Sequence, residues 1–219
     1  MSPALLVLEL PGRGPFQARN SPATRVPSHG TWDFGTAHAL DLVPVDLRGR
    51  SAPPTWRTLL ATEDPARFVG FGIDINAPVA GRVIQAHDAE PDGPARRSPL
   101  AYLAFAKGQP ERIRAGLAAV AGNHVVIGTA EGPFVLVAHL RQGSLAVRIG
   151  EQVAVGQRLG ACGNSGNSTQ PHVHLQATDS ANWQTAYAVP FVFRAFREAL
   201  TGSVRHHTLP KDGDSVVSW

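Results

Sequence analysis

The sequence has too few cysteines for the disulfide bonds or thiolate metal sites that stabilise many small proteins. It contains one cysteine, Cys162, and one methionine in 219 residues. A single cysteine cannot form an intramolecular disulfide, and it excludes a structural zinc site built from several thiolates. A chain of this length can bury a sizeable hydrophobic core and does not need disulfide bonds to fold. We therefore expect Cys162 to be a small buried thiol.

Long apolar runs and basic blocks are also missing. No stretch of eighteen apolar residues occurs, so we expect no integral membrane segment. The formal net charge is only +3, and no long Lys/Arg run or RNA-binding aromatic motif is present, which argues against a nucleic-acid partner. Residues 1–10 have no basic n-region, and Glu9 interrupts their apolar stretch. They make a poor signal peptide and predict a first strand.

Turn-forming residues are plentiful, with 22 glycines and 18 prolines, whereas aromatic residues make up only 7%. This composition favours many short strands over a helical bundle. Residues 11–27 are rich in turn formers and are expected to run over the surface. Helix formers in 100–120 and 191–200 predict short helices, with Pro110 in a first helical turn. Apolar patterning predicts strands at 39–46, 79–87, 123–128, 133–140, 145–149, 153–159 and 173–176.

The histidines carry the chemical signal. His172 and His174 are separated by one residue, so on a strand both imidazoles point to the same face. A polar, glycine-rich loop at 163–168 precedes them, and His139 ends another apolar run. Asp41 lies on the apolar face of an expected strand, where a carboxylate is costly unless it is paired or metal-bound. His29 precedes Asp41 by twelve residues.

Each of these residues alone has an ordinary structural explanation. The His-x-His pair could lie on an exposed edge strand, His139 could be a hydrogen-bonded structural residue, and Asp41 could cap a strand end. Together, several histidines and one aspartate fit a zinc site. A catalytic zinc takes three protein ligands and leaves a fourth position for water, whose pKa it lowers towards neutrality.

Longer segments of the sequence resemble the lysostaphin-type (LytM-like) zinc metallopeptidases, which are peptidoglycan endopeptidases. The resemblance rests on GNHVVI at 122–127 and on VAHLRQGSLAVRIGEQVAVGQRLGACGNSGNSTQPHVHLQ at 137–176. Upstream, SHGTWDFGTAHALDLV at 28–43 and APVAGRVIQAHD at 77–88 also resemble family segments. The resemblance implies a mainly β fold with an antiparallel core of the duplicated-hybrid-motif type, a central groove and one zinc ion per chain. It also implies hydrolysis of peptide bonds in cell-wall cross-bridges or stem peptides.

The family pattern assigns roles to five residues of this sequence. It implies that His29, Asp41 and His174 bind zinc. It implies that His139 and His172 are catalytic, since they match the histidines that assist proton transfer and stabilise the tetrahedral oxyanion. Which of these two acts as the base is left open.

The sequence departs from the family pattern in three places. Many members have a histidine four residues before the aspartate, whereas His38 precedes Asp41 by three and would point to the opposite strand face. His29 is therefore preferred as the ligand, with His38 as the alternative. Asp74, in a Gly-Ile-Asp-Ile run, has no histidine four residues before it and is not expected to bind metal. We expect one metallopeptidase domain over 1–219, with insertions at 49–69 and 88–120 that could cover the groove or set substrate choice.

Two other function classes remain possible at this stage. A non-catalytic zinc-binding or wall-binding module could keep the same fold. A histidine phosphocarrier, as in the glucose-specific IIA domain, needs two close imidazoles and no aspartate ligand. A lipoyl or biotinyl carrier is disfavoured, because the turn at 150–156 has no lysine to modify. The sequence indicates a cytoplasmic protein by its lack of a signal peptide, whereas wall hydrolysis would require a periplasmic, cell-wall or secreted one; it predicts no oligomeric state.

Overall fold

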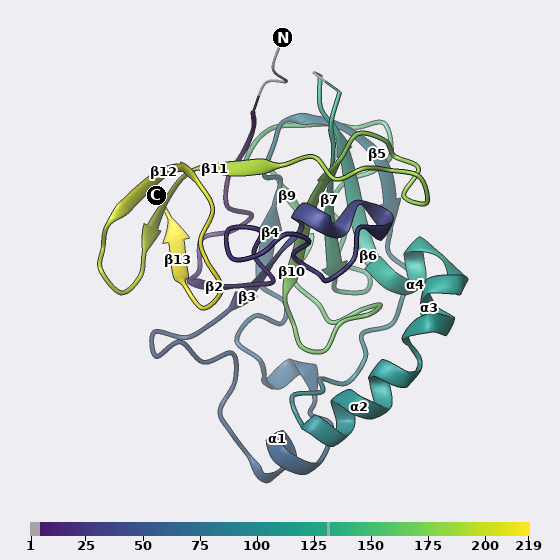
Figure 1. Ribbon diagram of the computed structural model, residues 1–219, viewed down its shortest axis with the longest axis vertical. Coiled ribbons are helices and arrows are strands. Elements are labelled where there is room, and N and C mark those ends of the chain that lie inside the picture. The colour runs from purple at the N-terminus through teal and green to yellow at the C-terminus, as the bar shows by residue number, and fades with distance from the viewer. Residues whose placement is uncertain (1–4, 131) are drawn as a thin grey trace.

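A computed structural model describes residues 5–130 and 132–219. The described residues form a mainly β fold with short helices, as the sequence predicts (Figure 1). Within them, a mixed eleven-stranded sheet has the order β1-β11-β13-β2-β3-β10-β7-β6-β5-β8, with β12 beside β11. Its pairs are antiparallel except β1 with β11, and β4 pairs with β9 in a separate ribbon. The strands are β1 (Leu6–Leu8), β2 (Phe16–Arg19), β3 (Leu40–Pro44), β4 (Asp74–Asn76), β5 (Gly81–His87), β6 (Asn123–Gly128), β7 (Phe134–Leu140), β8 (Gln152–Val153), β9 (Arg158–Ala161), β10 (Val173–Thr178), β11 (Phe191–Glu198), β12 (Val204–Thr208) and β13 (Ser215–Ser218).

The two faces of the central strands have different roles. Leu40 and Leu42 of β3 and Leu175 of β10 point into the main hydrophobic core. Because side chains alternate along a strand, Asp41 and His174 point to the opposite face. That face holds only a small apolar cluster, which includes Leu136. The polar side chains therefore lie on a sheet whose other side is anchored by the core.

The helices gather mainly at one end of the molecule (Figure 1). The segments expected to be insertions, 49–69 and 88–120, carry α1 and most of the larger helices. The prediction of helices in 100–120 is confirmed, and Pro110 lies in the first turn of α3. The single-domain organisation with these insertions stays a prediction. The helices are η1 (Asp33–His38), α1 (Trp56–Leu60), η2 (Pro65–Arg67), α2 (Pro99–Lys107), α3 (Gln109–Ala115) and α4 (Leu117–Ala121).

Four local predictions are wrong. The strand expected at 153–159 is two short strands, β8 and β9, separated by a turn at 154–157. The helix expected at 191–200 is strand β11, in which Phe191, Phe193 and Ala195 alternate into the interior. Residues 145–149 form no strand, although Ala146 hydrogen-bonds to Leu159. The turn-rich segment 11–27 contains β2, whose Phe16 is fully buried. Pairing with distant strands overrides local preference in these segments.

Across 5–130 and 132–219, every helix is too short or too polar to traverse a lipid bilayer.

Candidate functional site

A row of paired residues runs across four neighbouring strands and places the site. Arg19 of β2 pairs with Asp41 of β3, which pairs with His174 of β10, which in turn pairs with Ala138 of β7. Directly opposed residues on adjacent strands have Cβ atoms about 5 Å apart and share a face. The register of the sheet therefore brings Asp41 and His174 together, although 132 positions of sequence lie between them.

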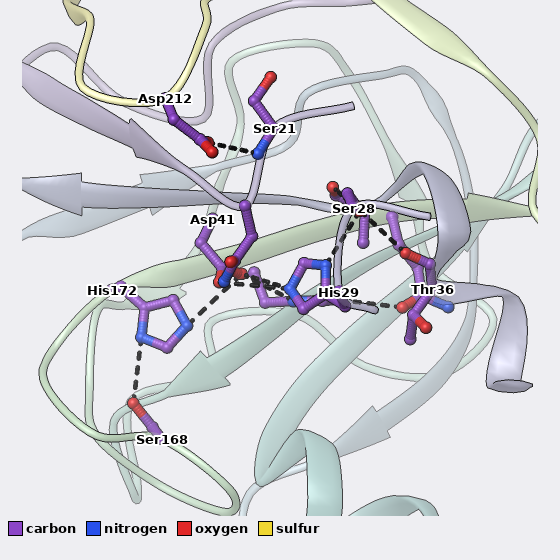
Figure 2. Close-up of polar contacts among 12 residues, drawn as sticks. Ser21, Ser28, His29, Thr36, Asp41, Ser168, His172 and Asp212 are labelled. Atoms are coloured by element: carbon purple, nitrogen blue, oxygen red, sulfur yellow. Dashed lines mark hydrogen bonds and ion pairs between the residues drawn. The ribbon is translucent and has the colours of Figure 1, made fainter. Parts of the chain in front are cut away.

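The Asp41 carboxylate is the centre of the site. Its Oδ1 lies 2.9 Å from Nδ1 of His174, 3.3 Å from Nε2 of His29 and 3.6 Å from Nε2 of His172. Figure 2 shows His29 and His172 approaching this carboxylate from opposite sides. Asn20 donates a 2.7 Å hydrogen bond to the other carboxylate oxygen, Oδ2. Asp41 is nearly buried, at 8% exposed, so these neighbours determine its charge.

Hydrogen bonds on the outer nitrogens fix the tautomers of His174 and His29. Nε2 of His174 lies 2.9 Å from Oε1 of Gln176, whose amide is oriented because its Nε2 donates to Phe34 O at 2.8 Å. Nδ1 of His29 lies 3.1 Å from Ser28 Oγ, and that hydroxyl donates to Ala39 O at 2.7 Å. We therefore assign the imidazole protons to the outer nitrogens. The inner nitrogens then direct lone pairs toward Asp41.

The donor set fits a metal ion such as zinc. One ligand atom each from His29, Asp41 and His174 lies within 4.8 Å of the others. Two imidazole lone pairs facing a carboxylate have no proton to share, so a cation between them would satisfy all three. The outer hydrogen bonds of His29 and His174 are the kind that orient metal-binding histidines.

His139 reaches the site through a strained backbone. Its φ angle is +61°, a left-handed conformation that costs a non-glycine residue about 1 to 3 kcal/mol. The β6–β7 register is irregular at this point, where one residue of β6, His124, opposes two of β7, Ala138 and His139. Bulges of this kind redirect a side chain, and the His139 ring comes to lie 4.6 Å from the His172 ring. Strict alternation along β7 would have placed His139 on the core face instead.

His139 and His172 are held in matching ways. Nδ1 of His139 donates to Ser165 O at 2.9 Å, and Nδ1 of His172 donates to Gln170 O at 2.8 Å. Ser168 lies on the side of His172 that faces away from Asp41, with its Oγ 3.1 Å from Nδ1 (Figure 2). These contacts leave each Nε2 directed toward the metal-capable group of His29, Asp41 and His174, with that of His172 3.6 Å from Asp41 Oδ1. Both nitrogens can exchange a proton there.

Burial and neighbouring charge set the protonation of the site. Burial, and then the charges of His172 and His174, hold the pKa of His139 well below its ordinary value, so this ring is neutral near pH 7. Burial would lower the pKa of His172, but the Asp41 carboxylate beside it outweighs that effect and raises it. Burial would raise the pKa of Asp41, yet the neighbouring imidazoles hold it well below its usual range. A metal ion at Asp41 would compete with these protons.

The other residues singled out in the sequence lie apart from this group. His38 ends η1, and the metal-capable group contains His29 in its place. Asp74 is exposed on β4 and pairs with Arg158 at 2.6 Å. Cys162 is fully buried, which raises the pKa of its thiol, so the prediction of a buried thiol is confirmed.

Sequence reasoning missed the groups that orient the site, Asn20, Ser28 and Gln176. Gln176 had a usable signal, because it lies two residues after His174 on the same strand and so shares its face. Asn20 and Ser28 lie in or beside turns, where such residues are common for local reasons. Their partners became visible only with the fold.

Comparison with known proteins identifies the relationship. The family model described as Peptidase family M23 matches residues 102–186, which include His139, His172 and His174 but not His29 or Asp41. No curated protein matches the chain. Among solved structures, a mutant catalytic domain of the prophage-encoded M23 protein EnpA from Enterococcus faecalis is 20% identical, with a TM-score of 0.45, covering 83% of this chain and 93% of that one. The catalytic domain of the antimicrobial peptidase lysostaphin from Staphylococcus simulans is 16% identical, with a TM-score of 0.39 and coverage of 81% and 84%. Residues 102–186 therefore resemble peptidase family M23, in agreement with the resemblance noted in the sequence.

Proposed function

We propose that this protein is a zinc-dependent endopeptidase that hydrolyses peptide bonds in peptidoglycan cross-bridges or stem peptides. The supporting observation is the convergence of the His29 and His174 rings on Asp41, with the rings of His139 and His172 beside them. The match of residues 102–186 to the model of peptidase family M23 agrees with this proposal. The substrate would meet the protein in the periplasm, in the wall or after secretion.

The chain's own residues supply binding and proton transfer in this proposal. His29, Asp41 and His174 would hold the zinc ion, which supplies a water of lowered pKa and polarises the scissile carbonyl. His139 and His172 provide two Nε2 atoms close to that centre. One accepts a proton during attack, and the other donates a hydrogen bond to the carbonyl oxygen as negative charge develops there. The fixed Nδ1 contacts with Ser165 and Gln170 hold both rings ready for these roles.

Zinc content tests the metal site directly. We expect about one zinc per chain in the wild type and none in Asp41→Ala, measured by elemental analysis after purification without chelator. Asp74→Ala is the matched control, because Asp74 lies in the other aspartate motif and is exposed; it should keep its zinc. A wild type without zinc, or an Asp41→Ala variant that retains it, would refute the assignment.

Two histidine variants separate binding from catalysis. His174→Ala should lose zinc and hydrolysis together, because it removes a ligand. His139→Ala should keep zinc while turnover of wall peptides falls by a factor of about 100 or more, since it removes only a proton-transfer group. Equal metal loss in both variants would contradict these roles.

The other two function classes predict different results. Zinc retention without hydrolysis of any wall peptide would favour a non-catalytic module. Absence of zinc together with phosphate transfer from a phosphohistidine donor would favour a phosphocarrier. The buried Asp41 carboxylate beside the imidazoles would repel a phosphoryl group, which disfavours the phosphocarrier.

A further inference from the structure

Two adjoining cavities extend the site along β2 and β3. The first has a volume of about 340 Å³ and includes Asp41 and His172 in its lining. The second, of about 350 Å³, begins where the first ends, and the two share Arg19, Val43 and Gln170. The metal-capable group therefore lies at one end of a longer groove.

Strand geometry sets the length of this groove. Gln17 and Arg19 of β2 pair with Val43 and Asp41 of β3, and all four lie on the face opposite the main core. Two residues of strand span about 6.8 Å, so Val45, just beyond β3, lies about 13 Å along the chain from Asp41. An extended peptide bound beside β2 and β3 would reach the outer cavity about two to four residues from the scissile bond.

The outer cavity is lined by three arginines and, within residues 5–130 and 132–219, by no carboxylate. Arg50 pairs with Asp46 at 3.3 Å, and Arg97 pairs with Glu63 at 2.8 Å, so both guanidinium groups are partly balanced. Arg19 differs from them, because its Nη2 contacts only the neutral Gln17 amide, at 2.7 Å. No carboxylate in the described part of the chain lies within ion-pair distance of Arg19.

Among the described residues that line the groove, the acidic ones lie at its inner end. Asp41 faces the histidines, and Asp212 uses Oδ1 to accept a 2.7 Å hydrogen bond from the Ser21 backbone N–H (Figure 2). The inner cavity thus holds two carboxylates beside Arg19, whereas the charged side chains that line the outer cavity are all arginines. A ligand with a carboxylate at the outer end would match this distribution of charge.

Hydrogen bonds hold the segments that line the outer cavity, which form the outer wall of the groove. Ser51 Oγ donates to Gln170 Oε1 at 3.0 Å and so ties the segment after β3 to the loop before His172. The Arg97 guanidinium also donates to Ala52 O at 3.2 Å and Pro53 O at 3.3 Å. These contacts position the wall without a ligand, which reduces the entropy lost when one binds.

We propose that the outer cavity is a subsite for a carboxylate of the peptide substrate, bound chiefly by Arg19. This inference rests on the proposed peptidase function and adds a substrate class to it: peptides with a carboxylate two to four residues from the scissile bond. An arginine fork is well suited to such a group, because it makes two charge-assisted hydrogen bonds to a carboxylate. The carboxylate can belong to an acidic side chain or to the end of a peptide.

Calorimetric titration with three peptides tests the proposal. The peptides are acetyl-Gly-Gly-Gly-Gly-Glu-amide, acetyl-Gly-Gly-Gly-Gly-Gln-amide and acetyl-Gly-Gly-Gly-Gly-Gln with a free carboxyl end. We expect the wild type to bind at least one acidic peptide about tenfold more tightly than the Gln amide. Preference for the Glu amide assigns a side-chain carboxylate, and preference for the free acid assigns a chain end. Equal binding of all three would overturn the proposal.

Variants at Arg19 make the test specific. Arg19→Gln should bring the Kd ratio between the acidic peptide and the Gln amide to about one. Arg19→Lys should retain part of the preference, since lysine keeps the positive charge but cannot make the two parallel hydrogen bonds of a guanidinium. Arg148→Gln is the matched control, because Arg148 is an exposed arginine outside the groove lining; it should keep the full preference. A preference that survives Arg19→Gln would also overturn the proposal.

Failure of the proposed subsite can be distinguished from failure of the proposed peptidase function. Mass spectrometry after each titration shows whether the peptide is intact, and where it is cleaved the kcat/KM ratio replaces the Kd ratio. A carboxylate preference without hydrolysis of any wall peptide would refute the peptidase and keep the subsite. Hydrolysis of wall peptides with equal binding of all three probes would refute the subsite alone.

Discussion

The orientation of each site imidazole depends on a neighbour that binds its outer nitrogen. His174 relies on Gln176, His29 on Ser28, and His139 on the Ser165 carbonyl. The sequence could predict the inner residues, because two histidines with a spacing of two and an aspartate on an apolar strand are unusual. It could not predict Ser28 or Ser165 as partners, because serine forms many local hydrogen bonds and nothing in its spacing distinguishes these.

Gln176 should tune metal affinity without touching the metal. Gln176→Leu removes the acceptor for His174 Nε2–H, so the ring loses its tautomer preference and zinc affinity should fall by about 10- to 100-fold. Competition titration with a fluorescent chelator measures this. Gln176→Glu keeps an oxygen acceptor and should retain affinity near that of the wild type. A similar loss in both variants would show that packing, and not the hydrogen bond, is responsible.

In two segments, pairing with distant strands determines the secondary structure, against the preference of the local residues. The alternating phenylalanines at 191 and 193 are a strand pattern, but Ala, Arg, Glu and Leu in the same segment favour helix, and the helical interpretation was wrong. β2 lies among prolines and glycines that mark turns, and only its pairing with β3 and β13 makes it a strand. By contrast, the strand at 123–128 was predicted with its observed bounds, since its run of β-branched residues is unbroken.

One ion pair joins the two segments that were expected to be insertions. Glu63 and Ala95 exchange backbone hydrogen bonds of 2.9 and 2.8 Å, and the Glu63 side chain, which is fully buried, pairs with Arg97. Hydrogen bonds from Arg97 outweigh the opposing effect of burial and lower the pKa of Glu63. This pair therefore holds the outer wall of the groove in place.

Replacing Glu63 should destabilise the fold in a pH-dependent way. The folded state lowers the pKa of Glu63, so its stabilisation is fully present above the unfolded-state value of about 4.3 and is lost as pH falls through the folded-state value. Glu63→Gln should reduce the free energy of unfolding by about 2 kcal/mol at pH 7, with a smaller difference as the pH falls below 4. Urea denaturation at several pH values measures this.

The control for that experiment is Glu111→Gln. Glu111 is exposed on α3, and its replacement should change the free energy of unfolding by less than about 0.5 kcal/mol. A loss in Glu63→Gln that stays constant across the pH range would contradict the role of the charge.

On the scale of the whole molecule, the site joins distant parts of the chain. Asp41 and His29 come from the first fifth of the sequence, while His139, His172 and His174 come from the part that matches the peptidase family. The fold class could be predicted from the sequence, and the predicted histidines lie together around Asp41, while their roles stay predictions. The groove and its distribution of charge could not be predicted, since they depend on how β2 and the segment after β3 lie against the loop before His172.

Metal binding at a site that joins distant parts of the chain should stabilise the entire fold. Zinc at a hundred times its Kd adds about 2.7 kcal/mol, which corresponds to a rise in Tm of about 5 to 11 °C for a protein of this size. Differential scanning calorimetry should show this rise for the wild type and for Asp74→Ala, but not for Asp41→Ala. An equal rise in Asp41→Ala would indicate binding elsewhere on the molecule.

The position of β2 in the sheet has a consequence for biosynthesis. β2 lies between β3, which carries Asp41, and β13, whose Ser215 pairs with Gln17. During synthesis on the ribosome, β2 can pair with β13 only after almost 200 further residues have been added. At ordinary elongation rates this takes about 10 to 40 s. The nascent chain cannot complete the strand that bears Arg19 and borders Asp41 before then. Any hydrolytic capacity would therefore appear only after β13 has emerged from the ribosome.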